Sequence, residues 1–355
     1  MATRRQCKWC GVPSLVPLGA QSLRCPTCHQ VTTLQTNYNG YRPPGVNGNV
    51  NLMPTPDSNR PYRPRAVNGG VYQVQPQPYH PPAYGRKRAV LCGITYKGSQ
   101  QSLNGSINDV VIMRKLLVEK FGFPSSAILM LTEEEDYKYI PTKKNVRAAL
   151  RWLVQGSRPG DSLVFHYSGH GSQVRDLDGD EVDGYDESLL PVDYQTEGRI
   201  LDDELNETIV RPLPKGATLH SIIDTCFSGT LLDLPNVCRI NRQGNYRWED
   251  HCIPHAAYKG TSGGLAISIS ACDDHQNSGD TTAFGPATGA LTYSFVQTLR
   301  QEPRLTYGRL LISMHNRIRA ARDAIGLNSN APHLSQEPQL SSSFKFEIHS
   351  KPFTI

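Results

Sequence analysis

The chain has 355 residues, a formal net charge of +5 at pH 7, and only 38% hydrophobic and 8% aromatic residues. This length allows one domain of ordinary size plus appendages, and the low apolar share indicates that part of the chain stays outside any core. The charge excess is too mild to indicate nucleic acid, and no apolar run approaches the ~20 residues needed to cross a bilayer, so neither nucleic acid nor a membrane is expected as a partner.

Two cysteine pairs lie within residues 1–36, Cys7-x-x-Cys10 and Cys25-x-x-Cys28. Four thiolates at this spacing are typical of a structural Zn²⁺ site, whose metal supplies the folding free energy that so short a segment cannot obtain from a core. Redox-active pairs are the alternative, but no strand and helix pattern surrounds them. The chain has nine cysteines, an odd number, and no apolar signal segment precedes the first, which predicts reduced thiols and a cytoplasmic or nuclear protein.

Residues 37–85 differ in composition from the rest of the chain. Between Tyr41 and Tyr84 there are ten prolines and a single acidic residue, Asp57. Such a stretch cannot bury enough apolar surface to offset its ordering entropy, so we predict a disordered, proline-rich linker. Together with the predicted zinc-binding segment 1–36, this linker is a predicted site for protein partners.

From residue 86 onward, apolar strands alternate with amphipathic helices. Strands are predicted at 88–95, 127–132, 162–167, 218–224, 264–270 and 343–348. Helices are predicted at 108–121, 142–155, 203–210, 290–300 and 307–324. The alternation predicts an α/β fold with a mostly parallel six-stranded sheet covered by helices on both faces, and ligands at the carboxyl ends of the strands.

Two of these strands end in a His and a Cys flanked by glycines. The strand at 162–167 runs into Ser168-Gly-His170-Gly171, and the strand at 218–224 runs into Thr225-Cys226. A thiol with an ordinary pKa of about 8.5 is mostly protonated at neutral pH, so a nucleophilic Cys226 needs an imidazole such as His170 to take its proton. A buried core thiol and a turn histidine are the alternative, but their shared strand-end position favours a catalytic pair.

The segments His166-Tyr-Ser-Gly-His-Gly171 and Asp224-Thr-Cys-Phe-Ser-Gly229 resemble the histidine and cysteine signatures of type I metacaspases. The cysteine-rich N-terminus is similar to the lesion-simulating-disease zinc finger of plant members. The resemblance implies the caspase-haemoglobinase fold over residues 86–355, with a p20-like region at 86–234, a linker at 235–260 and a p10-like region at 261–355.

The resemblance also implies substrate and cation sites. An acidic S1 pocket of Asp109, Ser168 and Asp224 would select protein substrates with Arg or Lys, because a desolvated cation must be paired. Ca²⁺ would bind through carboxylates and activate the enzyme. The implied calcium ligands are Asp186, Asp202, Asp203 and Asp233. The acidic run 176–187 does not itself fit an EF-hand, because Glu181 replaces the required glycine.

Further expectations follow from the same resemblance. The protein is expected to be a monomeric calcium-dependent endopeptidase acting in programmed cell death or a stress response, and to cut itself within 235–260 after Arg239, Arg242, Arg247 or Lys259. Phe227 stands where relatives usually have His, which keeps open a catalytically weak scaffold acting through the finger. A legumain-type or separase-type peptidase of the same fold is the remaining alternative.

Overall fold

The computed structural model describes residues 86–241, 243–253, 258–271, 280–281, 287–324 and 337–355, together with four short strands nearer the N-terminus. Those strands pair as two antiparallel hairpins: β1 (Ala2–Gln6) with β2 (Pro13–Pro17), and β3 (Ser22–Arg24) with β4 (Val31–Thr33). The four finger cysteines and the linker 37–85 lie outside the described residues. The zinc site and the disordered linker therefore stay predictions.

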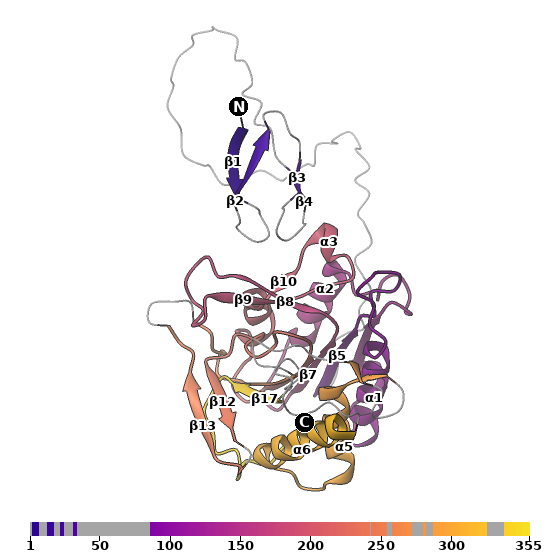
Figure 1. The fold of residues 1–355 in the computed structure, drawn as a ribbon. Coiled ribbons are helices and arrows are strands. Elements are labelled where there is room, and N and C mark those ends of the chain that lie inside the picture. Colours follow the sequence, from indigo (N-terminus) through magenta and orange to yellow (C-terminus); the bar gives the residue numbers. More distant parts are fainter. Residues whose placement is uncertain are drawn as a thin grey trace, which may run out of the picture.

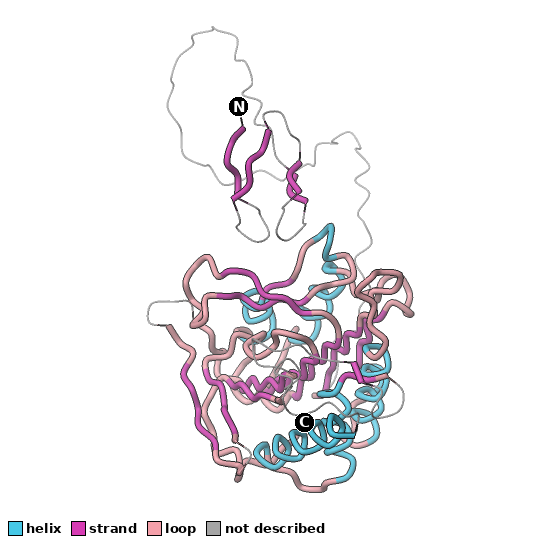
Figure 2. Tube along the Cα trace, in the orientation of Figure 1, coloured by secondary structure: helices cyan, strands magenta, loops and turns pink. Residues whose placement is uncertain are grey.

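A central sheet organises the described part of residues 86–355, where it has eight strands in the order β13-β12-β17-β14-β11-β7-β5-β6 (Figures 1 and 2). Five neighbouring strands run parallel: β6 (Ile128–Thr132), β5 (Lys87–Gly93), β7 (Ser162–Ser168), β11 (Thr218–Asp224) and β14 (Leu265–Ser270). Three antiparallel strands extend this sheet: β17 (Gln339–Ser342), β12 (Asn236–Ile240) and β13 (Tyr246–Asp250).

Both faces of the parallel strands are buried because successive side chains of each strand enter opposite cores. In β5, Ala89 and Leu91 pack in one core, while Val90 and Cys92 pack in the other. The first core lies under α1 (Ser106–Glu119), α5 (Ala290–Gln301) and α6 (Tyr307–Ala324), and the second lies under α2 (Lys143–Val154). No helix among the described residues is both long and apolar enough to span a membrane.

Smaller elements surround the sheet at the carboxyl end of β7. A three-stranded antiparallel sheet of β8 (Gly171–Arg175), β9 (Tyr185–Leu189) and β10 (Ile200–Leu201) follows β7 in the chain. Short helices α3 (Tyr194–Glu197) and α4 (Asp202–Leu205) flank β10, and a π-helical turn covers Asn206–Val210. The remaining elements are a 3₁₀ turn at Ser125–Ala127 and the strand pair β15 (Asp280–Thr281) and β16 (Thr288–Gly289).

The predicted fold class is confirmed, with three corrections. The sheet has eight strands among the described residues where six were predicted. The last strand is Gln339–Ser342 and not 343–348. Residues 235–260, expected to be a linker, contain the β12–β13 hairpin at the sheet edge. The alternation of helix and strand did not indicate the place of this hairpin in the sheet, because that place depends on β17, about a hundred residues further along the chain.

Candidate active site

The predicted catalytic residues follow strands that are paired in register. β7 and β11 run side by side, and Ser168, the last residue of β7, pairs with Asp224, the last residue of β11. His170 and Cys226 each come two residues later. The parallel register therefore places both at the same edge of the sheet, as the sequence predicted.

The two loops that carry these residues are in direct backbone contact. A Cβ added at Gly171 would lie 2.3 Å from the carbonyl oxygen of Cys226 and 2.7 Å from Oγ1 of Thr225. Only a glycine fits at such an approach. On the other side of the half-buried Cys226, Phe227 has a φ of 53°, in the left-handed region that a bulky residue rarely adopts. The backbone therefore makes a sharp turn at the residue that follows Cys226.

Contacts of the His170 ring define which nitrogen can act as a base. Its Nε2 lies 2.7 Å from the carbonyl oxygen of Gln101. Because a carbonyl oxygen only accepts, this contact places a proton on Nε2 and leaves Nδ1 as the acceptor of the neutral ring. The ring packs on Tyr96 with a centroid separation of 4.5 Å.

Two buried tyrosines hold the backbone of His170 in place. The hydroxyl of Tyr96 accepts the N–H of His170 at 2.9 Å and donates to the carbonyl of Leu190 at 2.6 Å. The hydroxyl of Tyr167 donates to the carbonyl of His170 at 3.0 Å. A surface cleft opens beside the imidazole, between residues 101–103 and Leu190. Sequence reasoning missed Tyr96 and Gln101, and the only available signal was that they follow the carboxyl end of β5.

The three predicted S1 residues lie together at the N-terminus of α5. Asp109, on α1, is fully buried and accepts a hydrogen bond of 2.8 Å from the hydroxyl of Ser168. The N–H of Gly289 donates to both oxygens of Asp109 at 3.0 Å, and the N–H of Thr292 donates to Asp224 at 2.8 Å.

Gly289 is the residue on which this set converges. A Cβ at this position would lie 2.1 Å from Oδ2 of Asp224 and 2.8 Å from Oδ2 of Asp109. Backbone N–H groups and the positive end of the helix dipole stabilise carboxylates here. Sequence reasoning did not find Gly289 and Thr292, because these residues approach the strand ends only through tertiary packing.

Comparison with known proteins agrees with this geometry. The family described as "Metacaspase, peptidase C14 domain" matches residues 87–235. Metacaspase-1 of Arabidopsis thaliana is 48% identical, over 98% of this chain and 95% of its own length. The chain belongs to the metacaspase family. Metacaspase-3 of the same plant is 46% identical over the full length of both proteins. This metacaspase is accordingly a cysteine-type endopeptidase, a hydrolase whose substrates are proteins.

A solved structure supports the fold. The crystal structure of a protein from Geobacter sulfurreducens aligns with a TM-score of 0.50 at 22% identity, over 76% of this metacaspase and 99% of that chain. Identity at this level supports the shared architecture only.

The predicted calcium ligands of this metacaspase fall into two adjoining groups. Carboxylate oxygens of Asp186, Asp202 and Asp203 lie within 4.8 Å of one another, whereas Asp233 groups with Asp180 and Glu181. Asp180 connects the groups, because its oxygens also approach those of residues in the first. We call the whole set the acidic cluster; its members are Asp176, Asp178, Asp180, Glu181, Asp186, Asp202, Asp203 and Asp233. The loop that carries the first four joins strands β8 and β9, not two helices, in agreement with the rejection of an EF-hand.

The acidic cluster is short of positive charge. Burial, and then repulsion from Asp203, raises the pKa of Asp186 to about 7. Burial, and then repulsion from Asp233, raises the pKa of Glu181 to about 9. Burial also raises the pKa of Asp233 to about 6, although the neighbouring Lys259 ammonium lowers it. Groups that resist ionisation in this way are those that a bound cation would stabilise.

The donors of the acidic cluster fit a hard divalent cation. All are carboxylate oxygens, the ligand type that Ca²⁺ prefers. Asp180 is 4% exposed, and neither of its oxygens accepts a hydrogen bond within the described part of the chain. Its Oδ2 lies 3.3 Å from the Lys259 ammonium, a single positive charge that Asp180 shares with Glu181 and Asp233. Because one ammonium cannot offset so many buried carboxylates, Asp180 is a further candidate ligand beside the predicted set.

Proposed function

We propose that this metacaspase cuts proteins after Arg or Lys, with Cys226 as the nucleophile and His170 as the base. The observation that supports these roles is the register of β7 and β11, which sets both residues two positions beyond a paired strand end. The contact between Gly171 and the carbonyl of Cys226 brings the two loops as close as backbones can pack.

The reaction is assigned to atoms as follows. Nδ1 of His170 takes the thiol proton. The Nε2–H group of the same ring stays hydrogen-bonded to the carbonyl oxygen of Gln101, and this hydrogen bond stabilises the imidazolium. The sulfur of Cys226 then bonds to the substrate carbonyl carbon, and backbone N–H groups of the two strand-end loops stabilise the oxyanion. The carbon–nitrogen bond breaks, and the imidazolium returns its proton to the departing amine. Water hydrolyses the thioester and restores the thiol.

Specificity for a basic residue is supported by the two carboxylates at the S1 site. Asp109 lies on α1 and Asp224 is the last residue of β11, and both carboxylates lie close to the backbone of Gly289. A guanidinium or ammonium that leaves water needs such partners, whereas an acidic side chain would be repelled. Cleavage after Asp is therefore not expected.

Activation by Ca²⁺ is supported by the position of the acidic cluster. Asp186, Asp202, Asp203 and Asp233, with Asp180 connecting the two groups, would hold the ion. When bound, it would offset the burial and mutual repulsion that raise the pKa values of Asp186, Asp202 and Asp203. Strand β8 begins at Gly171, directly after His170, and leads into the loop that carries Asp176 to Glu181. Order in that loop would therefore be transmitted to the imidazole.

A peptidase assay on purified protein tests these roles. The wild type is expected to hydrolyse an arginyl fluorogenic peptide in the presence of Ca²⁺ and to leave an aspartyl analogue intact. Cys226→Ala should be inactive, and Cys252→Ala, which removes an exposed thiol, should retain full activity. Equal rates for Cys226→Ala and the wild type would refute the nucleophile. Equal rates with Ca²⁺ and with a chelator would refute the activation by Ca²⁺ but would leave the roles of Cys226 and His170 in place.

Self-cleavage within 235–260 remains part of the proposal, and the strand pairing supports a position outside the β12–β13 hairpin. Arg239 and Arg247 face each other across the β12–β13 hairpin, and both contact Glu249. Peptide bonds in paired strands do not fit a protease cleft, which needs an extended free segment. Lys259 lies outside every strand. Arg242 lies outside the described residues.

The wider roles rest on the resemblance and on relatives alone. We propose that the finger, through Zn²⁺ on Cys7, Cys10, Cys25 and Cys28, and the proline-rich linker recruit protein partners. A monomeric state, action in the cytoplasm or nucleus, and a part in programmed cell death or stress are proposed with it. Zinc content of the purified residues 1–355, measured against a variant with Cys7 and Cys10 replaced by Ser, tests the finger.

A further inference from the structure

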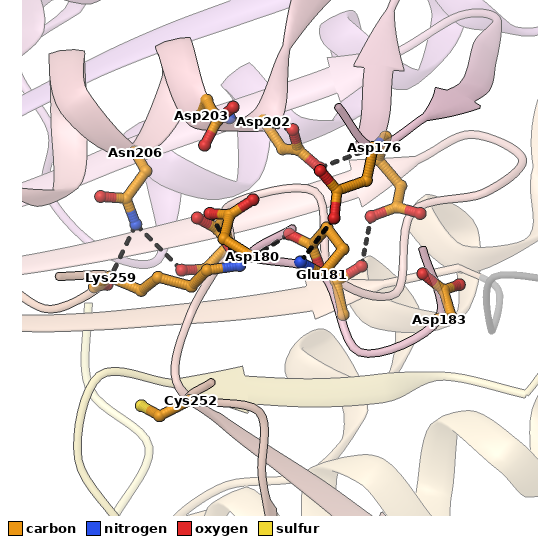
Figure 3. Close-up of polar contacts among 12 residues, drawn as sticks. Asp176, Asp180, Glu181, Asp183, Asp202, Asp203, Asn206, Cys252 and Lys259 are labelled. Atoms are coloured by element: carbon orange, nitrogen blue, oxygen red, sulfur yellow. Dashed lines mark hydrogen bonds and ion pairs between the residues drawn. The ribbon is translucent and has the colours of Figure 1, made fainter. Parts of the chain in front are cut away.

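Lys259 places its ammonium among carboxylates of the acidic cluster. Its side chain is 4% exposed, and Nζ lies 2.5 Å from Oδ1 of Asp233, 2.8 Å from Oε1 of Glu181 and 3.3 Å from Oδ2 of Asp180 (Figure 3). A buried ammonium is stable only where other groups replace its hydration. The position of Lys259 therefore depends on these three carboxylates.

The same carboxylates adjoin the proposed cation site. Asp180 approaches Asp176 and Asp186, then Asp178 and Asp203, and also Asp233, with its own oxygens free of hydrogen bonds from the described residues. A dication held by Asp180 would stand close to Nζ of Lys259, and like charges at that separation repel strongly in a buried site. The ammonium and the dication therefore compete for the carboxylates.

The backbone around Lys259 is attached in a way that allows local release. The side-chain amide of Asn206 donates to the carbonyls of Lys259, Leu232 and Asp233 at 3.0, 3.0 and 2.9 Å (Figure 3). Downstream, the N–H of Ser262 donates to the carbonyl of Arg211 at 3.1 Å. Upstream of Ser262, this short stretch is therefore tied to the rest of the fold by the ammonium contacts of Lys259 and by the hydrogen bond from Asn206.

We propose that Lys259 is a built-in counter-ion of the acidic cluster, which a divalent cation displaces, so that the segment from Lys259 to Thr261 is released. This inference rests on the proposed activation by Ca²⁺ and names its regulation. Without a cation, the ammonium ties the segment to the β8–β9 loop and to Asp233. With a cation, the side chain of Lys259 moves into solvent, and the peptide bond between Lys259 and Gly260 becomes accessible.

Calcium binding measured by calorimetry tests the competition. The full chain with Cys226→Ala serves as parent, so that no self-cleavage occurs. Adding Lys259→Met should tighten Ca²⁺ binding about tenfold, the size of an ordinary coupling between two sites. Adding Lys345→Met, which removes a half-exposed lysine that pairs with Asp250, should leave the affinity unchanged. Equal or weaker Ca²⁺ binding by the Lys259 variant would overturn the role of Lys259 as a counter-ion but would leave the cation site in place. No Ca²⁺ binding by either parent or variant would overturn both the counter-ion role and the cation site.

Limited proteolysis tests the release without altering Lys259. The Cys226→Ala parent is digested with a lysine-specific protease, with and without saturating Ca²⁺, and the fragments are identified by mass spectrometry. Cleavage after Lys259 should become about tenfold faster with Ca²⁺, as expected for a coupling of this size. Cleavage after Lys345 provides the internal reference and should not change. A constant ratio of the two rates overturns the proposal, even if the methionine variant fails to fold.

Discussion

Gly171→Ala should separate the two catalytic loops without removing any functional group. The new Cβ would lie 2.3 Å from the carbonyl oxygen of Cys226, whereas ordinary contacts begin at 3.4 Å. The loops must therefore move apart by about 1 Å. A misplacement of about 1 Å can lower catalysis about 10²-fold, which corresponds to about 2.7 kcal/mol of transition-state stabilisation.

The assay combines kcat/KM for an arginyl peptide with the pH dependence of Cys226 alkylation, which reports how the imidazole and thiol are aligned. Gly264→Ala is the matched control, because its Cβ would lie 2.7 Å from the carbonyl oxygen of Pro214, just ahead of β14 and at the opposite edge of the sheet. It should lower stability but keep the activity of the folded protein. An unchanged kcat/KM and alkylation profile in Gly171→Ala would show that the loop contact does not set the catalytic geometry.

Three other changes probe the site. Tyr96→Phe removes the hydroxyl that bonds the N–H of His170 and the carbonyl of Leu190. The free energy of unfolding should therefore fall by about 1–3 kcal/mol, and kcat should fall as well. A lower stability with an unchanged kcat would show that this tyrosine serves folding and not catalysis. Asp224→Asn should raise KM for an arginyl peptide by about 10²-fold, since a desolvated guanidinium loses its charged partner, and an equal loss on a neutral peptide would contradict the S1 role. In a chelator, the thermal midpoint should fall from pH 7 to pH 9, because the raised pKa values of Glu181 and Asp186 make the folded chain bind more protons than the unfolded chain in this window, which lies above the range where the lowered pKa values of buried His166 and His220 act in the opposite sense. Saturating Ca²⁺ should flatten this slope, and a midpoint that rises with pH in the chelator would contradict the assigned charge deficit.

The amino-acid sequence by itself determined the strand and helix series and the proposed catalytic pair. Buried strands and amphipathic helices are encoded by local periodicity, and parallel strand ends meet at one edge of a sheet whatever lies between them. His170 and Cys226 could therefore be proposed from the residues that follow two strands. The β12–β13 hairpin could not, because its place in the sheet depends on β17, which follows it by about a hundred residues.

Only the tertiary structure decided what surrounds that pair. The carbonyl of Gln101 orients the imidazole, and the N–H of Gly289 donates to Asp109 of the proposed S1 site, yet neither residue carries a local pattern. Asp180 and Asp233 became neighbours of Lys259 through loops that lie far apart in the chain. Charges attract or repel according to distance in space, and that distance is set by packing and not by position in the sequence.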